Sequence, residues 1–490
     1  MPFTPDSNAS TSIAPEQENN LTQWLIGIVM ALTIVRIAAL FISPLELGFD
    51  EAQYWVWAQQ LEFGYFTKPP LIAWAIAATT SVCGDGQACV RAMSPLAHAI
   101  TALLLFATAT KLYGRKAAFW TAVFYLVIPG IAVSSLLITT DALLLMFWSM
   151  GLLALISYRH DPKLKWAVLF GLAVGLGLNA KYAMIYLPLI AIPAVFFDLR
   201  LRSALKASHV LLALVVAAVL ISPNIVWNIN NGFATVTHTS ENIGWALSRL
   251  NYKDGFEFFV TQFGVAGPIV FGVMIASLLL GRKTTHPEND RLLKWLSWPV
   301  ILLITVQGFL SQANANWGAT AFPAGIILVA ALLCDPSNRI WLRLNLAING
   351  LVSVAVLAFT LLGVPQNNAV WSKPLRQLTG WQLTADNVLK IAEREQAEKL
   401  VVFGRAMTAS MIYATRDSEI QILALALSNR AFDQFQLKRP WRVGDDRENV
   451  LVIGIHKELA EQLNADEIAI VDAPLFSLPN KKLSVYLLEP

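Results

Sequence analysis

The stretch "GFDEAQYWVWAQQLEFGYFTKPPLIAW" (48–74) follows directly on the first apolar run of the chain, 22–42. The acidic pair Asp50 and Glu51 stands where that run ends, aromatic residues follow, and Lys68 precedes a double proline. A run of this length and apolarity predicts a helix that spans a membrane. Because charge is costly to bury in a membrane, two carboxylates and a lysine at its edge suggest a function.

The composition of the whole chain also indicates a membrane protein. Of 490 residues, 56% are hydrophobic and 14% are charged, and the mean hydropathy is +0.54. In soluble domains, about a quarter of the residues are charged. The net charge of +3 and the lack of a zinc-finger or RNA-binding signature argue against a nucleic-acid partner. The sequence contains no CxxC, HExxH or Gly-rich phosphate-loop motif.

The polar residues 1–21 predict a disordered tail. They lack the basic start of a secretory signal, so we expect the first apolar run to be retained as an anchor. Residues 69–82 are too few to cross a bilayer comfortably, and we expect an interfacial or re-entrant helix there. About eleven runs approach the length of a membrane span: 22–42, 92–112, 117–137, 141–158, 166–180, 182–198, 207–224, 258–280, 295–312, 317–334 and 341–363.

Alternate loops between these runs are rich in lysine and arginine. The basic loops are 111–116, 159–165, 198–206, 281–294 and 335–343. The positive-inside rule places them in the cytoplasm together with the N-terminus. The opposite loops, which include 43–91, 224–257 and 311–319, and the chain after 363 then face outward. Arg36 lies inside the first run and must snorkel or find a partner.

Residues 366–490 form a unit of different composition. Five short apolar runs (399–404, 420–425, 449–455, 467–472 and 483–488) follow a helical pattern at 384–398. Strands that alternate with helical segments predict a small α/β domain. We expect it to be a cap on the extracytoplasmic side, and nothing in it reads as a catalytic motif.

Asp50 and Lys68 lie on an outer loop that the double proline makes rigid. Opposite charges at the edge of this rigid loop could hold a lipid head group, with Lys68 as a point charge for phosphate. For Glu51 alone, and for the aromatic residues with Tyr54, a solvated position at the membrane interface is the simpler interpretation.

Asp141 stands in a short outer turn, Thr139–Asp141, between two long apolar runs. One interpretation is an N-cap of the following helix, a role that Asp141 and the preceding Thr139 and Thr140 suit. The other is a functional acid at membrane depth. The two roles are compatible and equally supported.

Four further residues fall on outer turns or loops. Lys181 binds an anion or only snorkels. His238 could ligate a metal or bind phosphate, although a lone histidine in a polar loop is usually neither. Asn316 and Trp317 could hydrogen-bond and stack on a sugar, yet both residue types are also ordinary at membrane interfaces.

The order of several motifs resembles a known family. These are "FDEAQYWVWAQ", "GYFTKPPLIAW", "LLITTDALLLMFW", "GLGLNAKYAM", "SPNIVWNINNGFATVTHT" and "NANWGATAFPA". Together they resemble the bacterial membrane glycosyltransferases of the protein O-mannosyltransferase and aminoarabinose transferase superfamily, which have the GT-C fold. The resemblance covers 22 to about 335 and is specific in the Asp-Glu loop and the Lys-Pro-Pro element.

The resemblance implies an α-helical polytopic protein of the bacterial inner membrane, active on the periplasmic face with a polyprenyl-phosphate-linked sugar as donor. Asp50 and Lys68 match the family's loop aspartate and lysine, and Asp141 is similar to its acid at the second outer turn. The aminoarabinose branch has an arginine three residues after the aspartate and a glutamate before the lysine. This sequence has Gln53 and Thr67 there, in place of the branch's phosphate arginine and its possible metal ligand, so we assign no metal. No cofactor is predicted, and the sequence does not support a divalent metal.

Residue chemistry and resemblance together predict a glycosyltransferase. Asp50 would act as the base, Lys68 would bind the lipid phosphate, and Asp141 would orient the acceptor or the lysine. Further substrate contacts are expected from Glu51, Tyr54, Lys181, His238, Asn316 and Trp317. Direct displacement would invert the anomeric centre. The acceptor hydroxyl could belong to lipopolysaccharide, another glycan or a protein.

Two other classes remain open. A transporter or flippase would show repeated halves and ionisable groups near the membrane midplane, and the sequence has no duplicated motif. A structural or assembly protein would explain the hydropathy but not Lys68 beside Asp50.

Cys83 and Cys89 bracket the stretch "CGDGQAC" of the first outer loop. Its two glycines would let the chain fold back, and a periplasmic compartment is oxidising, so a disulfide is favoured over two free thiols.

Overall fold

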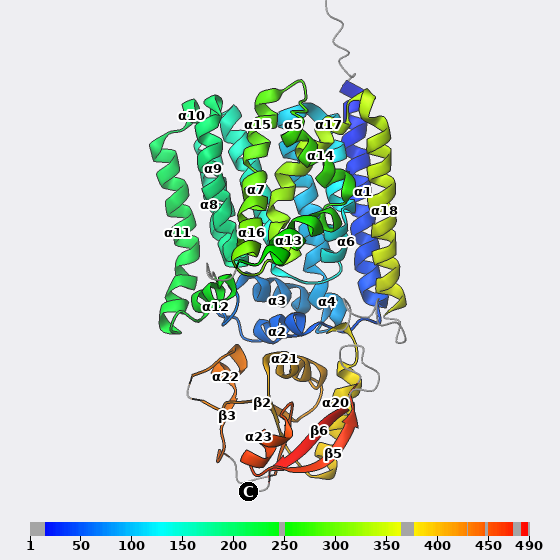
Figure 1. Ribbon diagram of the computed structural model, residues 1–490, viewed down its shortest axis with the longest axis vertical. Coiled ribbons are helices and arrows are strands. Elements are labelled where there is room, and N and C mark those ends of the chain that lie inside the picture. The colour runs from blue at the N-terminus through cyan, green and yellow to red at the C-terminus, as the bar shows by residue number, and fades with distance from the viewer. Residues whose placement is uncertain are drawn as a thin grey trace, which may run out of the picture.

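The protein is a bundle of long helices with a small sheet domain below it, as Figure 1 shows for the computed structural model. The structure describes residues 15–244, 250–363, 377–428, 430–445, 449–473 and 482–488. The helices of the bundle are α1 (Pro15–Ile42), α2 (Phe49–Ala58), α3 (Leu71–Cys83), α4 (Gln87–Arg91), α5 (Met93–Val127), α6 (Pro129–Ser134), α7 (Thr140–His160), α8 (Leu164–Ala180), η1 (Tyr182–Ile185), α9 (Tyr186–Phe197), α10 (Leu199–Ala204), α11 (Ala207–Asn230), α12 (Ala234–Ile243), α13 (Tyr252–Val265), α14 (Pro268–Leu279), α15 (Pro287–Trp295), α16 (Trp298–Leu310), η2 (Ala315–Ala321), α17 (Phe322–Leu333), η3 (Pro336–Asn338) and α18 (Arg339–Leu362).

The protein is a membrane protein, but the expected count of eleven spans is not established. Among the described residues, seven helices are long and apolar enough to cross a membrane, or eight if one bent pair counts as a span. The runs 166–180 and 182–198 form the shorter apolar helices α8 and α9.

Helix α5 combines two of the expected runs and turns back on itself. His98 Nδ1 lies 2.8 Å from the hydroxyl of Tyr125, which is 27 positions away. A continuous helix would separate these residues by about 40 Å at 1.5 Å per residue. The chain reverses at Gly114, whose φ of 82° leaves the helical region. The expected division into 92–112 and 117–137 is therefore present within α5 and α6.

The run 258–280 is not one straight helix. α13 and α14 meet at an angle of 118°. Gly267 stands at the break with a φ of 85°, which favours glycine, and Pro268 opens the second helix. This pair is a broken span or a re-entrant loop.

The five basic loops lie together at one end of the bundle, as the charge pattern predicts. The contacts that join them are Tyr113 to Asp290, Arg159 to Asp198, Arg159 to Asn289, and Cys334 to the carbonyl of Lys116. Loops that share an end of the bundle share a side of the membrane. The C-terminal domain lies at the other end (Figure 1).

The N-terminal helix begins earlier than the polarity of the sequence suggests. α1 starts at Pro15, so the prediction of disorder is wrong for 15–21, and residues 1–14 lie outside the described part of the chain. Arg36 finds a partner within the bundle, because its Nη2 donates to the carbonyl of Leu126 at 2.6 Å. That carbonyl belongs to the last turn of α5, where the helix itself leaves carbonyls without partners.

The first outer loop folds into the short helices α2, α3 and α4, which lie across the end of the bundle (Figure 1). α3 corresponds to the run 69–82, expected to be interfacial. Cys83 and Cys89 are joined by a disulfide, as the sequence favoured, and it links the end of α3 to α4.

The C-terminal domain is the expected α/β unit. Its elements are α20 (Trp381–Arg394), β1 (Lys399–Val402), α21 (Arg405–Ala414), β2 (Gln421–Leu425), α22 (Gln434–Lys438), β3 (Pro440–Trp441), β4 (Val450–Ile453), α23 (Lys457–Gln462), β5 (Asp466–Asp472) and β6 (Lys482–Leu488). The sheet order is β3-β2-β1-β4-β6-β5. β1 pairs in parallel with β2 and β4, and β6 pairs antiparallel with β4 and β5. Of the strands that the structure describes, the two-residue edge strand β3 is the one that the sequence did not predict.

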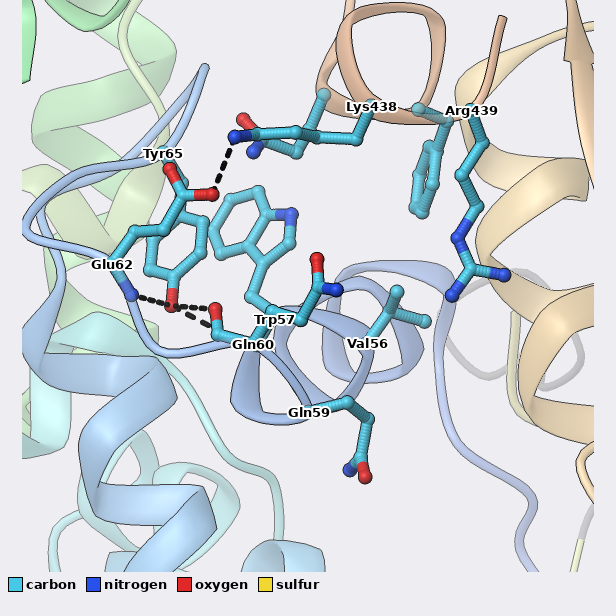
Figure 2. A pocket seen from close by; sticks show the side chains of 10 residues that line it. Val56, Trp57, Gln59, Gln60, Glu62, Tyr65, Lys438 and Arg439 are labelled. Atoms are coloured by element: carbon cyan, nitrogen blue, oxygen red, sulfur yellow. Dashed lines mark hydrogen bonds and ion pairs between the residues drawn. The ribbon is translucent and has the colours of Figure 1, made fainter.

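The domain is docked on the first outer loop. α21 packs against α2, and the ring of Trp55 meets that of Tyr413 edge-on at 5.0 Å. At the other end of α2, a small pocket separates the loop from α22, and Figure 2 shows Lys438 reaching across it to Glu62. The two charged groups are 2.5 Å apart.

Candidate active site

Glu51 is a structural residue that anchors α2. Its carboxylate accepts two hydrogen bonds from Arg91, at 2.7 and 2.8 Å, and further bonds from the backbone amides of Gly48 and Ile138. Only 5% of the residue is exposed. The interpretation of Glu51 as a solvated interface acid is therefore wrong. With both oxygens bonded inside the protein, it is also badly placed for the substrate contact we expected.

Asp50 points to the C-terminal domain instead. Adjacent residues of a helix are turned about 100° apart, so Asp50 and Glu51 face different neighbours. Oδ1 of Asp50 lies 2.8 Å from Nη1 of Arg405, and the same Nη1 donates to Oε1 of Gln53 at 3.0 Å. Oδ2 of Asp50 has no partner among the residues that the structure describes. Half of this side chain is exposed, which leaves an oxygen available to a substrate.

Lys68 lies in the turn that joins α2 to α3, where its carbonyl accepts from the amide of Tyr65. Burial lowers the pKa of Lys68, and the nearby charge of Lys181 lowers it further, whereas Asp50 and Asp141 oppose the shift. These groups therefore lie within electrostatic range of one another. In the described parts of the chain, the ammonium of Lys68 has neither a hydrogen bond nor an ion pair.

Asp141 stands at the start of α7 and forms the second half of the site. Nζ of Lys181 lies 2.7 Å from Oδ1, and Nδ2 of Asn316 donates to Oδ2 at 2.7 Å. The N-cap of α7 is Thr139, so the interpretation of Asp141 as the cap is wrong. Because both of its oxygens are bonded, Asp141 is less suited than Asp50 to accept a proton.

The remaining candidates lie around this cluster. Burial lowers the pKa of His238, and the charges of Lys68 and Arg405 add to that effect. Tyr54 is buried beneath the site against Trp57. Trp317 follows Asn316 in η2 and packs against the hydrophobic core of the bundle. Its stacking on a sugar stays a prediction.

Hydrogen bonds occupy polar groups beside Lys68 and at His238. At the position before Lys68, the hydroxyl of Thr67 accepts a hydrogen bond from Gln53 at 3.3 Å. His238 pairs with the amide of Asn242. Within the described ranges, no group of three or more His, Cys, Asp or Glu side chains is arranged to hold a metal ion. Lysine and arginine dominate the cluster, and they bind anions.

Arg405 is the residue that sequence reasoning missed. Together with Asp50, Lys68, Asp141 and Lys181 it forms what we call the charged cluster. Each carboxylate of this cluster has its own cation, and Lys68 provides a further positive charge. The cluster can therefore bind an anion beside a carboxylate that is open to proton transfer.

A family model described as dolichyl-phosphate-mannose-protein mannosyltransferase matches residues 67–227. The lipid A galacturonosyltransferase RgtD of Rhizobium johnstonii is 35% identical over 410 residues, which cover 81% of this chain and 84% of that protein. The chain belongs to the protein O-mannosyltransferase and aminoarabinose transferase superfamily. It is a membrane glycosyltransferase, as the motifs predicted.

Members of the superfamily from other branches are also similar to this chain. The undecaprenyl phosphate-alpha-4-amino-4-deoxy-L-arabinose arabinosyl transferase of Aeromonas salmonicida is 27% identical, over 65% of this chain and 60% of that protein. ArnT from Cupriavidus metallidurans, solved bound to undecaprenyl phosphate, superimposes with a TM-score of 0.67 at 16% identity over 95% of this chain and 98% of that one. This likeness shows the GT-C fold over nearly the whole length.

Proposed function

We propose that the protein transfers an acidic sugar of the galacturonic acid class from a polyprenyl phosphate to a hydroxyl of lipid A. The relative that is 35% identical is named a lipid A galacturonosyltransferase. The donor's lipid would stay in the bilayer, its phosphate would lie at the interface, and its sugar would project into the site between the bundle and the C-terminal domain.

The observation that carries the proposal is the excess of positive charge in the charged cluster. Lys181 pairs with Asp141 and Arg405 pairs with Asp50, whereas Lys68 forms no ion pair with any carboxylate that the structure describes. The phosphate of the donor balances this one excess positive charge, and the same cations would also attract a sugar carboxylate. An aminoarabinose donor would instead bring a positive charge next to these cations.

The reaction follows from the roles of these residues. The acceptor oxygen bonds to the anomeric carbon while the bond from that carbon to the phosphate oxygen breaks, and its electron pair stays on the lipid phosphate. The acceptor's proton passes to the open Oδ2 of Asp50. Lys68 stabilises the charge that grows on the departing phosphate, so no strong acid is needed. Asp141 holds Lys181 and Asn316 in place. The acceptor attacks the face opposite the departing phosphate, so the reaction inverts the anomeric centre.

We place the site on the periplasmic face of the bacterial inner membrane. Five basic loops share the opposite end of the bundle, which the positive-inside rule assigns to the cytoplasm. The disulfide between Cys83 and Cys89, in the same outer loop as Asp50, supports an oxidising compartment on this side. The C-terminal domain, 366–490, would then be periplasmic.

Reconstitution tests this function. The purified protein in proteoliposomes, supplied with lipid A and polyprenyl phosphate-linked galacturonate, is expected to produce lipid A whose mass increases by one uronate. A matched reaction with an aminoarabinose donor should give little product. Movement of labelled donor across the bilayer without any sugar transfer would contradict the proposal and favour a flippase.

A further inference from the structure

Arg405 occupies a defined position in the sheet domain. It is the first residue of α21 and follows Gly404, whose φ is 94°, at the carboxyl end of β1. β1 lies between its parallel partners β2 and β4. In open α/β sheets, ligands bind at the carboxyl ends of the strands, where neighbouring connections diverge. α21 lies next to α2, as Figure 1 shows.

The guanidinium is held by the first turns of α2. Nη1 donates to Asp50 at 2.8 Å and to Gln53 at 3.0 Å, and the guanidinium carbon lies 5.2 Å from the centre of the Phe49 ring. Both hydrogen bonds use Nη1. Nη2 and Nε have no partner within the described ranges, and 35% of the side chain is exposed. One edge of the fork is therefore fixed while the other edge is open.

We propose that Arg405 is the second phosphate-binding cation of the donor site, with Nη2 and Nε directed at two phosphate oxygens beside Lys68. This rests on the proposed function, since it assigns a residue to the same donor. Arginine suits the task because its planar fork matches two phosphate oxygens, whereas lysine acts as a point charge. Gln53 links the two cations, because its Oε1 accepts from Arg405 at 3.0 Å and its Nε2 donates to Thr67, the residue before Lys68, at 3.3 Å.

During transfer, Arg405 would act on the leaving group. As the bond from the anomeric carbon to the phosphate oxygen breaks, that oxygen gains the electron pair and the phosphate becomes more negative. A guanidinium already fixed by Asp50 and Gln53 needs no rearrangement to stabilise this charge. The same contact keeps Asp50, the proposed base, beside the phosphate.

The C-terminal domain then completes the site rather than merely covering it. Its docking depends on contacts away from Arg405. They include Lys438 to Glu62, Gln434 to the amide of Phe66, and the hydroxyl of Tyr413 to the carbonyl of Asp85. Loss of docking and loss of the Arg405 side chain can therefore be separated by mutation.

Lipid binding by the full-length protein in nanodiscs tests the proposal. The probes are undecaprenyl phosphate and undecaprenol, which lacks the phosphate. Arg405→Gln is expected to weaken the affinity for undecaprenyl phosphate by about tenfold or more and to leave that for undecaprenol unchanged. Arg405→Lys should fall in between. The control is Arg394→Gln, which removes an exposed arginine of α20 paired only with its neighbour Glu395 among the described residues; it should bind like the wild type.

Three outcomes would overturn the proposal. One is an Arg405→Gln variant that binds undecaprenyl phosphate as tightly as the wild type. Another is equal weakening for undecaprenol. The third is equal weakening by Lys438→Gln, which would mean that domain docking, and not the guanidinium, accounts for the effect. If the wild type transfers no sugar from any polyprenyl phosphate, the proposed function itself fails. An active wild type beside an unaffected Arg405→Gln overturns only the role of Arg405.

Discussion

Nη1 of Arg405 and Oδ1 of Asp50 lie 2.8 Å apart, although 355 positions separate these residues in the chain. The contact joins the sheet domain to the short helix that presents the proposed base. An active site that spans two domains is complete only when they are docked. On the proposed account, the C-terminal domain contributes to the active site and is not a passive cap.

Donor binding should depend on pH through Lys68. Burial lowers the pKa of this ammonium from its ordinary value of 10.5, with Lys181 as the second cause. The charged form binds phosphate, so affinity is present below the lowered pKa and is lost as the pH rises through it. In Lys68→Arg the alkaline loss should vanish, because a guanidinium stays protonated. Measuring the Kd for undecaprenyl phosphate between about pH 7 and 10 checks this, and identical profiles for both proteins would contradict it.

Asp141 and Lys181 should behave as a coupled pair. Their side chains are 11% and 19% exposed, so Asp141→Asn leaves a mostly buried ammonium without its carboxylate. We expect lower thermal stability and transfer reduced about tenfold or more. Adding Lys181→Met should restore stability but not transfer, with a coupling of about 0.5–3 kcal/mol in unfolding. Purely additive effects on unfolding would show that the pair is not coupled.

Glu51→Gln should damage the fold rather than the chemistry. The pair with Arg91 is nearly inaccessible, with exposures of 1% and 6%, and losing one charge of such a pair costs about 3–5 kcal/mol. Thermal unfolding in detergent should show this loss, while Glu393→Gln on the exposed face of α20 should change little. Weaker donor binding by a fully stable Glu51→Gln protein would instead restore Glu51 as a substrate contact.

Several features of the fold could be predicted because each depends on local pattern. Apolar runs predicted the long helices, and the alternation of loop charge predicted that the basic loops share one end. Strand-like runs predicted β1, β2, β4, β5 and β6. The break at Gly267 could have been suspected from "GP", which opens a new helix after a left-handed residue. The angle between α13 and α14 could not, because it depends on packing.

The site was predictable only in part. Asp50, Lys68, Asp141 and Lys181 stand at the edges of apolar runs, where charge is conspicuous. Arg405 occurs in an ordinary polar segment, and no local pattern connects it to Asp50. Glu51 follows Gly48 by three residues, the spacing at which a glutamate bonds back to the start of its own helix, and Arg91 stands just before an apolar run. These two features could have indicated that Glu51 is a buried carboxylate at a helix start. Sequence alone did not say which of two adjacent acids would face inward.

Orientation in the membrane can be tested with cysteine chemistry. Under reducing conditions, a thiol reagent that cannot cross the membrane should label Cys83 and Cys89 from the periplasmic side of intact spheroplasts. Without reduction, neither should react, since the two are joined. Cys334, which lies at the end with the basic loops, is the internal control and should stay unlabelled until the membrane is opened. Labelling of Cys334 in intact spheroplasts would indicate the opposite orientation in the membrane and contradict the assignment.

The rate of sugar transfer by Asp50→Asn tests the central claim most directly. Asparagine keeps the size of aspartate and can still accept the hydrogen bond from Arg405, but it cannot take the acceptor's proton. A single-turnover assay with purified donor and lipid A should show a rate reduced by about 10²–10⁴-fold, with the Kd for undecaprenyl phosphate changed much less. A rate close to that of the wild type would contradict the account, because Asp50 would then not be the base.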